Sequence, residues 1–168
     1  MRYLAVLFLL LLQTSCKQNT RNYTHIIVEN KIVNATVLQK IDNPEKALLS
    51  WYLFAYGNEC TTDSNKTKCQ ILKLLAIDDE CDKEHIDFLN KWLNKNILIQ
   101  LKLRNCPSLP HKSAIQNNIE KIVIKRVSDT LSISIKVSGM NTIQEKFWTI
   151  EKTESLILNN NTLTKTND

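Results

Sequence analysis

Two cysteines and two histidines near the middle of the chain have a spacing that could bind a metal ion. Cys81 and His85 form a Cys-x3-His pair, and Cys106 and His111 form a Cys-x4-His pair. Thiolate and imidazole ligands at short spacing suit tetrahedral zinc. The alternative is that the two cysteines are oxidised and the two histidines are surface residues. We favour this alternative for an exported chain, so we predict no metal site.

A nucleophilic site could be built from Cys106 or a serine with His111 and an acid. The three histidines of the chain lie in different segments, and no motif surrounds any of them. Gly57 and Gly139 are the only glycines. They cannot supply a glycine-rich phosphate loop, a dinucleotide-binding fingerprint or a nucleophile elbow. We therefore expect no catalytic residues and no cofactor, and the protein is predicted not to be an enzyme.

The N-terminus has the pattern of an export signal. Arg2 gives a positive start, and nine apolar residues run from Leu4 to Leu12, shortly before Cys16. Nine residues make about 13 Å of helix, far less than the roughly 20 residues that cross a membrane. Residues 1–15 are therefore predicted to be a cleaved signal peptide.

The end of this apolar run resembles the lipobox of bacterial lipoproteins. Ser15-Cys16 matches the last positions of the lipobox, whereas Gln13 stands where leucine is usual and Leu12 lies one residue further out. The resemblance implies that Cys16 carries a lipid and anchors the chain in the cell envelope, facing the periplasm or the cell surface. Lys17 stands where aspartate would be the usual retention signal, which favours the outer membrane. The alternative is an ordinary signal peptide with an incidental cysteine.

The four remaining cysteines agree with export. Cys60, Cys69, Cys81 and Cys106 form an even set, which predicts two disulfides with three possible pairings. We expect neighbours in sequence to pair, giving Cys60–Cys69 and Cys81–Cys106. The loop-entropy model assigns roughly 3 kcal/mol to each such closure.

The first half of the mature chain, after an opening strand segment, is predicted to be helical. Residues 25–38 favour β structure. A helix then begins at Asp42 or Asn43, with Pro44 and Glu45 suited to its first turn and apolar residues at helical spacing up to residue 56. Further helices are expected over residues 68–77 and after residue 82.

The second half is predicted to be rich in strands. Apolar residues recur at every second position over residues 97–103 and most clearly over residues 131–137, where we expect the odd positions to be buried. Other strands are expected over residues 119–127, 143–151 and 155–158. Residues 128–130 and 139–141 are predicted to form turns.

This order of elements predicts an α+β domain with helices packed on one face of a curved antiparallel sheet. The Asn43-Pro44-Glu45-Lys46 helix start, the following Trp51-Tyr52 pair and the closing strands around residues 147–150 resemble the nuclear-transport-factor-like cone fold. In such a cone, aromatic side chains could line a pocket, although plain core residues are the alternative. We predict a tether over residues 16–24, a single domain over residues 25–160 and a polar tail over residues 161–168. The candidate pocket residues are Trp51, Tyr52, Trp92 and Trp148.

The charge pattern favours binding over catalysis. Residues 91–128 carry eight basic side chains against one acid, Glu120, and a cluster of acids precedes them. Nucleic acid is an unexpected partner for an exported chain, and no aromatic residues interleave the basic ones from Lys102 onward. We expect a lipid-anchored module that binds a small ligand or a protein, possible forms including an immunity-type lipoprotein that neutralises a toxin. The alternative is a small periplasmic enzyme, which an acid beside His85 or His111 in a pocket would favour.

Overall fold

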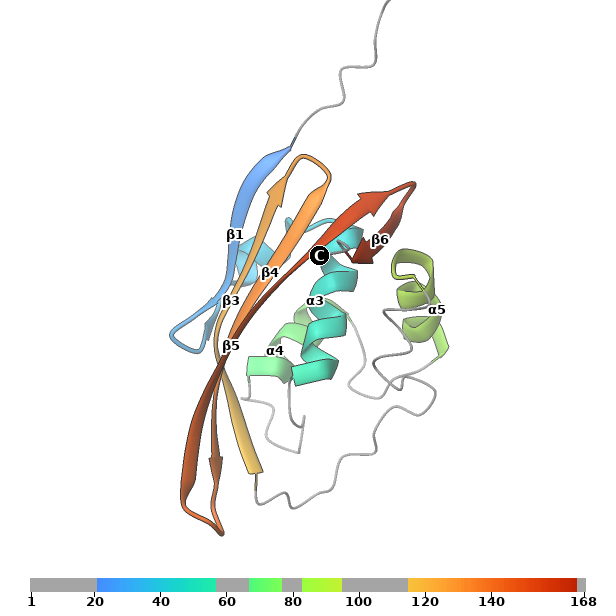
Figure 1. The fold of residues 1–168 in the computed structure, drawn as a ribbon. Helices are drawn as coiled ribbons and strands as arrows, with labels where there is room; N and C mark the ends of the chain where they lie inside the picture. Colours follow the sequence, from blue (N-terminus) through green and yellow to red (C-terminus); the bar gives the residue numbers. More distant parts are fainter. Residues whose placement is uncertain (1–20, 57–66, 77–82, 95–114, 166–168) are drawn as a thin grey trace, which may run out of the picture.

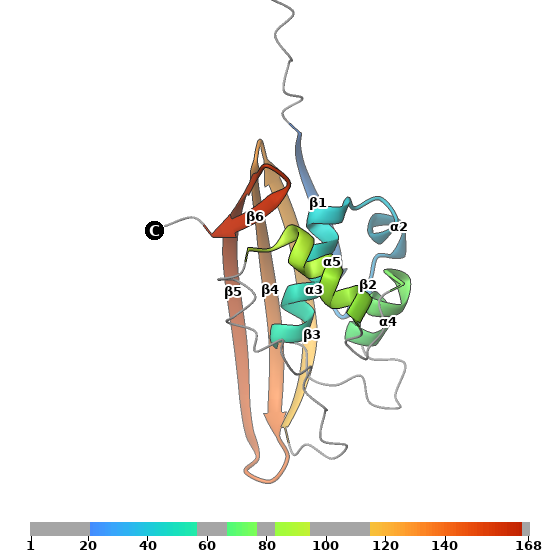
Figure 2. The same ribbon diagram turned by 90° about the vertical axis from the view of Figure 1, so that its right-hand side faces the viewer.

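The computed structural model describes residues 21–56, 67–76, 83–94 and 115–165. It confirms the α+β class: helices lie on one face of a six-stranded antiparallel sheet with the strand order β2-β1-β3-β4-β5-β6 (Figures 1 and 2). The elements are β1 (Asn22–Glu29), β2 (Ile32–Val33), α2 (Ala35–Leu38), α3 (Asn43–Tyr56), α4 (Thr67–Leu74), α5 (Lys83–Trp92), β3 (Ile115–Val127), β4 (Thr130–Asn141), β5 (Lys146–Asn159) and β6 (Thr162–Lys165).

The helix α3 begins where the sequence predicts, and of the two candidate caps it is Asp42 that accepts the capping hydrogen bond. The backbone N–H of Glu45 donates to the Asp42 carboxylate at 3.2 Å, and the backbone N–H of Asp42 donates to the Glu45 carboxylate at 2.9 Å. This reciprocal capping box satisfies two backbone donors at the helix end. It fixes where α3 begins and therefore where its apolar face meets the sheet.

The alternation along β4 is also confirmed. Leu131, Ile133, Ile135 and Val137 are buried, and the intervening residues are not. These side chains point toward the helices because successive strand residues face opposite sides of a sheet. Together with the apolar faces of α3, α4 and α5 they form one continuous core.

Asparagine occupies three of the seven left-handed positions in the described part of this glycine-poor chain. Asn30 and Lys31 both have positive φ in the two-residue turn between β1 and β2. Asn160 and Asn161 have the same conformation between β5 and β6. Two consecutive left-handed residues suit a tight hairpin, and asparagine tolerates this region better than most residues.

One predicted turn is wrong, because β4 continues through residues 139–141. Gly139 lies opposite Trp148 on β5 and Asn117 on β3, and both side chains occupy the space that a Cβ atom would need. The glycine therefore serves close packing in a strand, and the turn follows it at residues 142–145.

The bounds of several elements also differ from the prediction, and β1 begins at Asn22, inside the segment over residues 16–24 that was predicted to be a tether. Residues 35–38 form the short helix α2 rather than a strand, and residues 146–159 form one continuous strand rather than two. Residues 162–165, assigned to a polar tail from the sequence, form β6, in which Leu163 is fully buried. The two-asparagine turn before β6 allows this return, and burial of Leu163 stabilises it.

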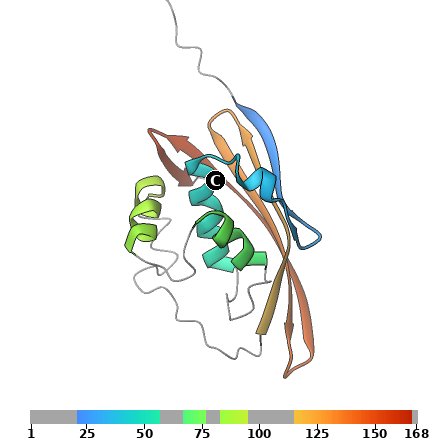
Figure 3. The same cartoon turned by 180° about the vertical axis from the view of Figure 1, so that it is seen from behind.

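The described helices leave the opposite face of the sheet bare, and the β4–β5 hairpin extends past them (Figures 1 and 3). Hydroxyl pairs cross this bare face: Ser132 bonds Ser155 at 2.8 Å, and Ser134 bonds Thr153 at 2.7 Å. No described helix is long and apolar enough to span a membrane.

Candidate functional site

Five ionisable side chains from three elements converge at the N-terminus of α3. Tyr23 and His25 come from β1, Asp42 and Glu45 from the α3 capping box, and Arg126 from β3. They meet because the register of β1 on β3 places Tyr23 opposite Arg126, on the helix-covered side. The sequence patterns did not predict this cluster.

The members of the cluster are held by one ion pair, one histidine–carboxylate contact and a ring stack. His25 Nδ1 lies 3.1 Å from Glu45 Oε1, and Arg126 donates to Asp42 Oδ2 at 3.2 Å. The Tyr23 and His25 rings are stacked with their centroids 4.4 Å apart. Each pair joins the start of α3 to a different strand, so the cluster positions that helix on the sheet.

Burial controls the electrostatics of the cluster. The Glu45 side chain is only 1% exposed, whereas His25 is 22% exposed. Burial raises the pKa of the Glu45 carboxyl above its ordinary value of 4.5; the Asp42 backbone hydrogen bond lowers it, and the Asp42 carboxylate raises it further. Burial likewise raises the pKa of Tyr23 to about 12, although its hydrogen bond to Arg126 acts in the opposite direction.

The raised pKa of Glu45 makes stability depend on pH. Its contribution to folding is fully present below the unfolded pKa of about 4.5 and is lost as the pH rises through the higher folded value. Glu45→Gln has no such titration. We therefore expect the stability of wild type relative to Glu45→Gln to increase as the pH falls from 7 to 4.5.

Urea unfolding of both proteins at several pH values measures this difference. Lys73→Gln is the matched control because Lys73 is exposed on α4 and lies outside the cluster. A constant difference between wild type and Glu45→Gln, or one that favours the variant on acidification, would contradict the assignment.

A second polar pair lies inside the helix layer. Ser50 Oγ and His85 Nε2 are 2.8 Å apart, and both residues are buried. Serine beside histidine is one part of a nucleophilic site. The pair links α3 to α5, and a hydrogen bond of this kind also satisfies two polar groups that α3 and α5 bury against each other.

The four predicted pocket residues do not come together as one site. Trp51 and Tyr52 are core residues of α3 with edge-to-face rings 4.6 Å apart, whereas Trp148 packs over Gly139 at the far end of the sheet. Trp92 lies at the end of α5 and is half-buried. Of the four, only Trp51 and Tyr52 belong to the buried core.

Tyr52 also hydrogen-bonds an acid on the sheet. The partner is Glu154 of β5, which lies 2.9 Å from Lys152 and 3.7 Å from Lys165. Partial burial raises the pKa of Glu154, but the hydrogen bonds from Tyr52 and Lys152 and the nearby lysines outweigh it and leave the pKa below its ordinary value. This carboxylate holds α3 against the outer strands.

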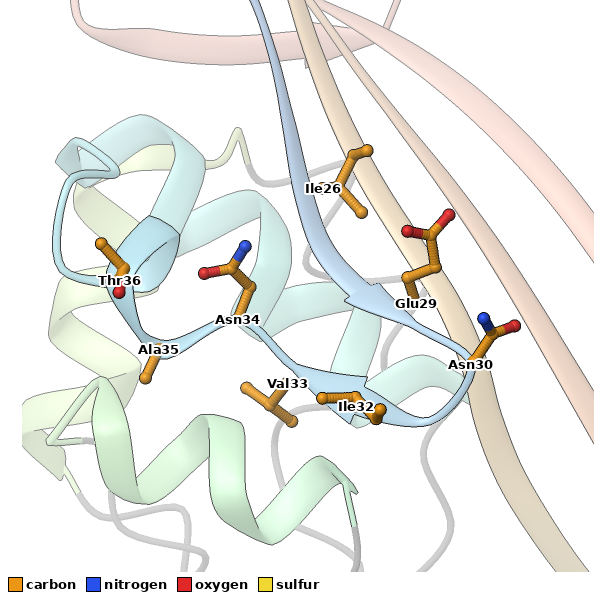
Figure 4. Close-up of a pocket in the computed structure, with 8 residues that line it drawn as sticks. All are labelled: Ile26, Glu29, Asn30, Ile32, Val33, Asn34, Ala35 and Thr36. Carbon is orange, nitrogen blue, oxygen red and sulfur yellow. The ribbon is translucent and has the colours of Figure 1, made fainter.

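A surface hollow of about 560 Å³ lies at the β1–β2 edge of the sheet (Figure 4). None of the predicted pocket residues lines it. Its walls come from the end of β1, the following turn, β2 and the first turn of α2. The lining residues are Ile26, Glu29, Asn30, Ile32, Val33, Asn34, Ala35 and Thr36.

Among the described residues, the two most exposed large apolar side chains lie at and beside the tip of the β4–β5 hairpin. Ile143 is 80% exposed in the turn, and Phe147 is 76% exposed at the start of β5. The Asn141 side chain accepts hydrogen bonds from the backbone N–H groups of Ile143 and Gln144 at 3.0 and 3.1 Å. These two hydrogen bonds order the turn and therefore hold the backbone that carries Ile143 and Phe147 in a defined conformation.

Several predictions fall outside the described residues. They concern the signal peptide, Cys16, Cys60, Cys81, Cys106, His111 and the strand expected over residues 97–103. Cys69 lies in α4 and is half-buried. Both disulfide pairings therefore remain predictions, which peptide mapping under non-reducing conditions would test. Within the described ranges, no cluster of three or more His, Cys, Asp or Glu side chains could hold a metal ion.

No family model, curated protein or solved structure matches this chain.

Proposed function

We propose that this protein is a lipid-anchored protein-binding module of the bacterial cell envelope. The anchor is a lipid on Cys16 after removal of residues 1–15, and the module is a cone-like α+β domain. The observation that supports binding is the pair of exposed apolar side chains, Ile143 and Phe147, on the projecting β4–β5 hairpin.

Exposed large apolar side chains collect on the sheet rather than on the helices. Of the eight such residues in the described chain, seven belong to the sheet strands and their turns, and only Leu74 belongs to a helix. Apolar groups gathered on one part of a soluble surface commonly mark a contact site. Aromatic and large aliphatic anchors also dominate the binding energy of protein interfaces.

The hairpin geometry favours a protein partner. The arm extends beyond the described helices, so none of them covers either face of its tip (Figure 2). The Asn141 side chain orders the turn before binding, which lowers the entropy lost on association. We therefore assign Ile143 and Phe147 as the anchors of the interface.

A small periplasmic enzyme is the second candidate. Its best support is the cluster of Tyr23, His25, Asp42, Glu45 and Arg126, because a histidine beside a buried acid can transfer protons. In the described structure these groups contact each other, and Asp42 and Glu45 form the α3 cap. None of the five lines the hollow at β1–β2. The cluster therefore fits a role in positioning α3 better than one in catalysis.

Replacing one anchor should weaken partner binding without affecting the fold. Ile143→Ser removes an apolar side chain that touches mainly solvent, so its melting temperature should equal that of wild type. Loss of an interface anchor costs about 2 kcal/mol, or roughly 30-fold in affinity. The measurement is the yield of each co-purifying envelope protein, by quantitative mass spectrometry, with tagged full-length protein in detergent.

The matched control is Ile157→Ser, because Ile157 is 39% exposed on the bare face at the other end of β5. We expect at least one envelope protein to be retained by wild type and Ile157→Ser and lost with Ile143→Ser. If Ile143→Ser recovers every co-purifying protein as well as wild type does, the hairpin is not the binding site.

A further inference from the structure

The two edges of the sheet differ in how they are covered. Beside β6, Leu93 forms a parallel bridge with Leu163, and the backbone N–H of Asn94 donates to the Leu163 carbonyl at 3.3 Å. Beside β1, the strand β2 pairs only with Val28 and Glu29. Within the described residues, Asn22–Ile26 of β1 has a strand partner on one side only, which is β3.

The side chain of Asn34 explains why β2 is so short. The backbone N–H of Asn34 donates to the Ile27 carbonyl at 2.9 Å, and this hydrogen bond continues the line of β2 along β1 by one residue. Its side-chain oxygen then accepts from the backbone N–H of Val37 at 3.1 Å and caps α2. The chain therefore turns away into α2, which stays in contact with β1, and no described strand follows the line of β2 beside Ile26.

This edge lacks the usual protection against strand pairing. Exposed edge strands commonly carry lysine, proline or a bulge that prevents another chain from adding. The β1 edge reads Asn22-Tyr23-Thr24-His25-Ile26, with no lysine and no proline. Its register shift with β3 falls between Ile26 and Val28, below the open stretch.

We infer that an extended peptide segment of a partner protein adds to the sheet along Asn22–Ile26 of β1, in the line that β2 vacates. The hollow in Figure 4 lies at the lower end of this line and has apolar walls from Ile26, Ile32 and Ala35, so it suits one apolar side chain of the peptide. Main-chain hydrogen bonds would supply affinity, and this pocket would supply selectivity.

Charge determines which peptide fits. Glu29 lies at the hollow and forms no ion pair with a described residue. At the other end of the open edge, Lys125 lies beside Thr24 and Arg21 precedes β1, and neither has a described acidic partner. A peptide that runs antiparallel to β1, as β2 does, therefore needs a base first, then an apolar residue, then an acid.

The probe is a blocked hexapeptide with the sequence Lys-Val-Thr-Val-Thr-Glu, added to the full mature domain. We expect saturable binding and slower amide hydrogen exchange over residues 22–26, with no change over residues 130–137. Two versions N-methylated at alternate amides distinguish backbone pairing from other contacts. In a strand addition only one of the two loses binding, because alternate amides point toward and away from β1.

Two matched variants locate the site. Ile26 is 40% exposed and Ile157 is 39% exposed, and both face the bare side of the sheet. Ile26→Lys should weaken peptide binding by roughly tenfold or more, because it adds a lysine to the edge and fills the hollow. Ile157→Lys should leave binding within about twofold of wild type.

The inference is overturned if the hexapeptide does not bind, if both N-methylated versions bind as well as the parent peptide, or if both lysine variants lose binding equally. These outcomes leave the hairpin proposal unaffected, because Ile143 and Phe147 lie at the opposite end of the sheet from Asn22 (Figure 1).

Discussion

Ile133→Ala should lower the free energy of unfolding by about 2–5 kcal/mol, the cost of removing a buried aliphatic side chain and leaving a cavity. Ile133 is fully buried in the middle of β4, with Ile124 of β3 and Glu154 of β5 on either side. Strands on both sides and helices above restrict collapse of the cavity. The m-value in urea should stay constant while the midpoint falls.

The neighbouring residue provides the control. Ser134 points to the bare face, where its hydroxyl bonds Thr153 at 2.7 Å in an exposed position. Ser134→Ala should therefore cost at most about 1 kcal/mol. A larger loss of unfolding free energy for Ser134→Ala than for Ile133→Ala would show that the other face of β4 is buried and would contradict the fold.

Cys16→Ser should abolish attachment of the lipid. An acyl chain contributes about 0.8 kcal/mol per buried CH₂ group, so a modified Cys16 with several chains holds the protein in the bilayer. Serine cannot form the thioether that carries them. We expect wild type to partition into the detergent phase of Triton X-114 and Cys16→Ser to appear as a soluble or uncleaved form.

Ser15→Ala is the control for this experiment, because it changes the neighbouring residue and keeps the cysteine. It should partition as wild type does. Release of wild type from membranes by salt alone, without detergent, would show that the attachment is electrostatic and would refute the lipid anchor.

Local signals in the sequence predicted the elements that depend on neighbours along the chain. Asp42, Pro44 and Glu45 determine where α3 begins, and the structure confirms the capping hydrogen bonds. The alternation from Leu131 to Val137 predicted which face of β4 is buried, because this pattern needs no knowledge of the partner strands.

Features that depend on distant partners could not be predicted in this way. Gly139 reads as a turn residue until Trp148 is known to pack on it from β5. Leu163 is one apolar residue in a polar segment, and its burial depends on a hairpin made by Asn160 and Asn161. The first error came from a local turn signal and the second from the polarity of the segment around Leu163, whereas packing between strands decides both positions.

The ionisable cluster was missed for the same reason. Glu45 and His25 are 20 residues apart in sequence, and Arg126 and Asp42 are 84 apart. Only the register of β1 against β3, with the α3 cap above it, brings them together. The exposed hairpin tip was missed because Ile143 and Phe147 look like ordinary strand residues, and only the tertiary arrangement shows that no described helix covers them.

The central claim, that this is a protein-binding module acting through the β4–β5 hairpin, is tested most directly by site-specific photo-crosslinking in intact cells. A benzophenone amino acid replaces Ile143 in one strain and Ile157, on the bare face at the other end of β5, in a second strain. The account predicts one discrete crosslinked product to an envelope protein from position 143 and none to that protein from position 157. No discrete product from position 143, or the same product at equal yield from both positions, would contradict it.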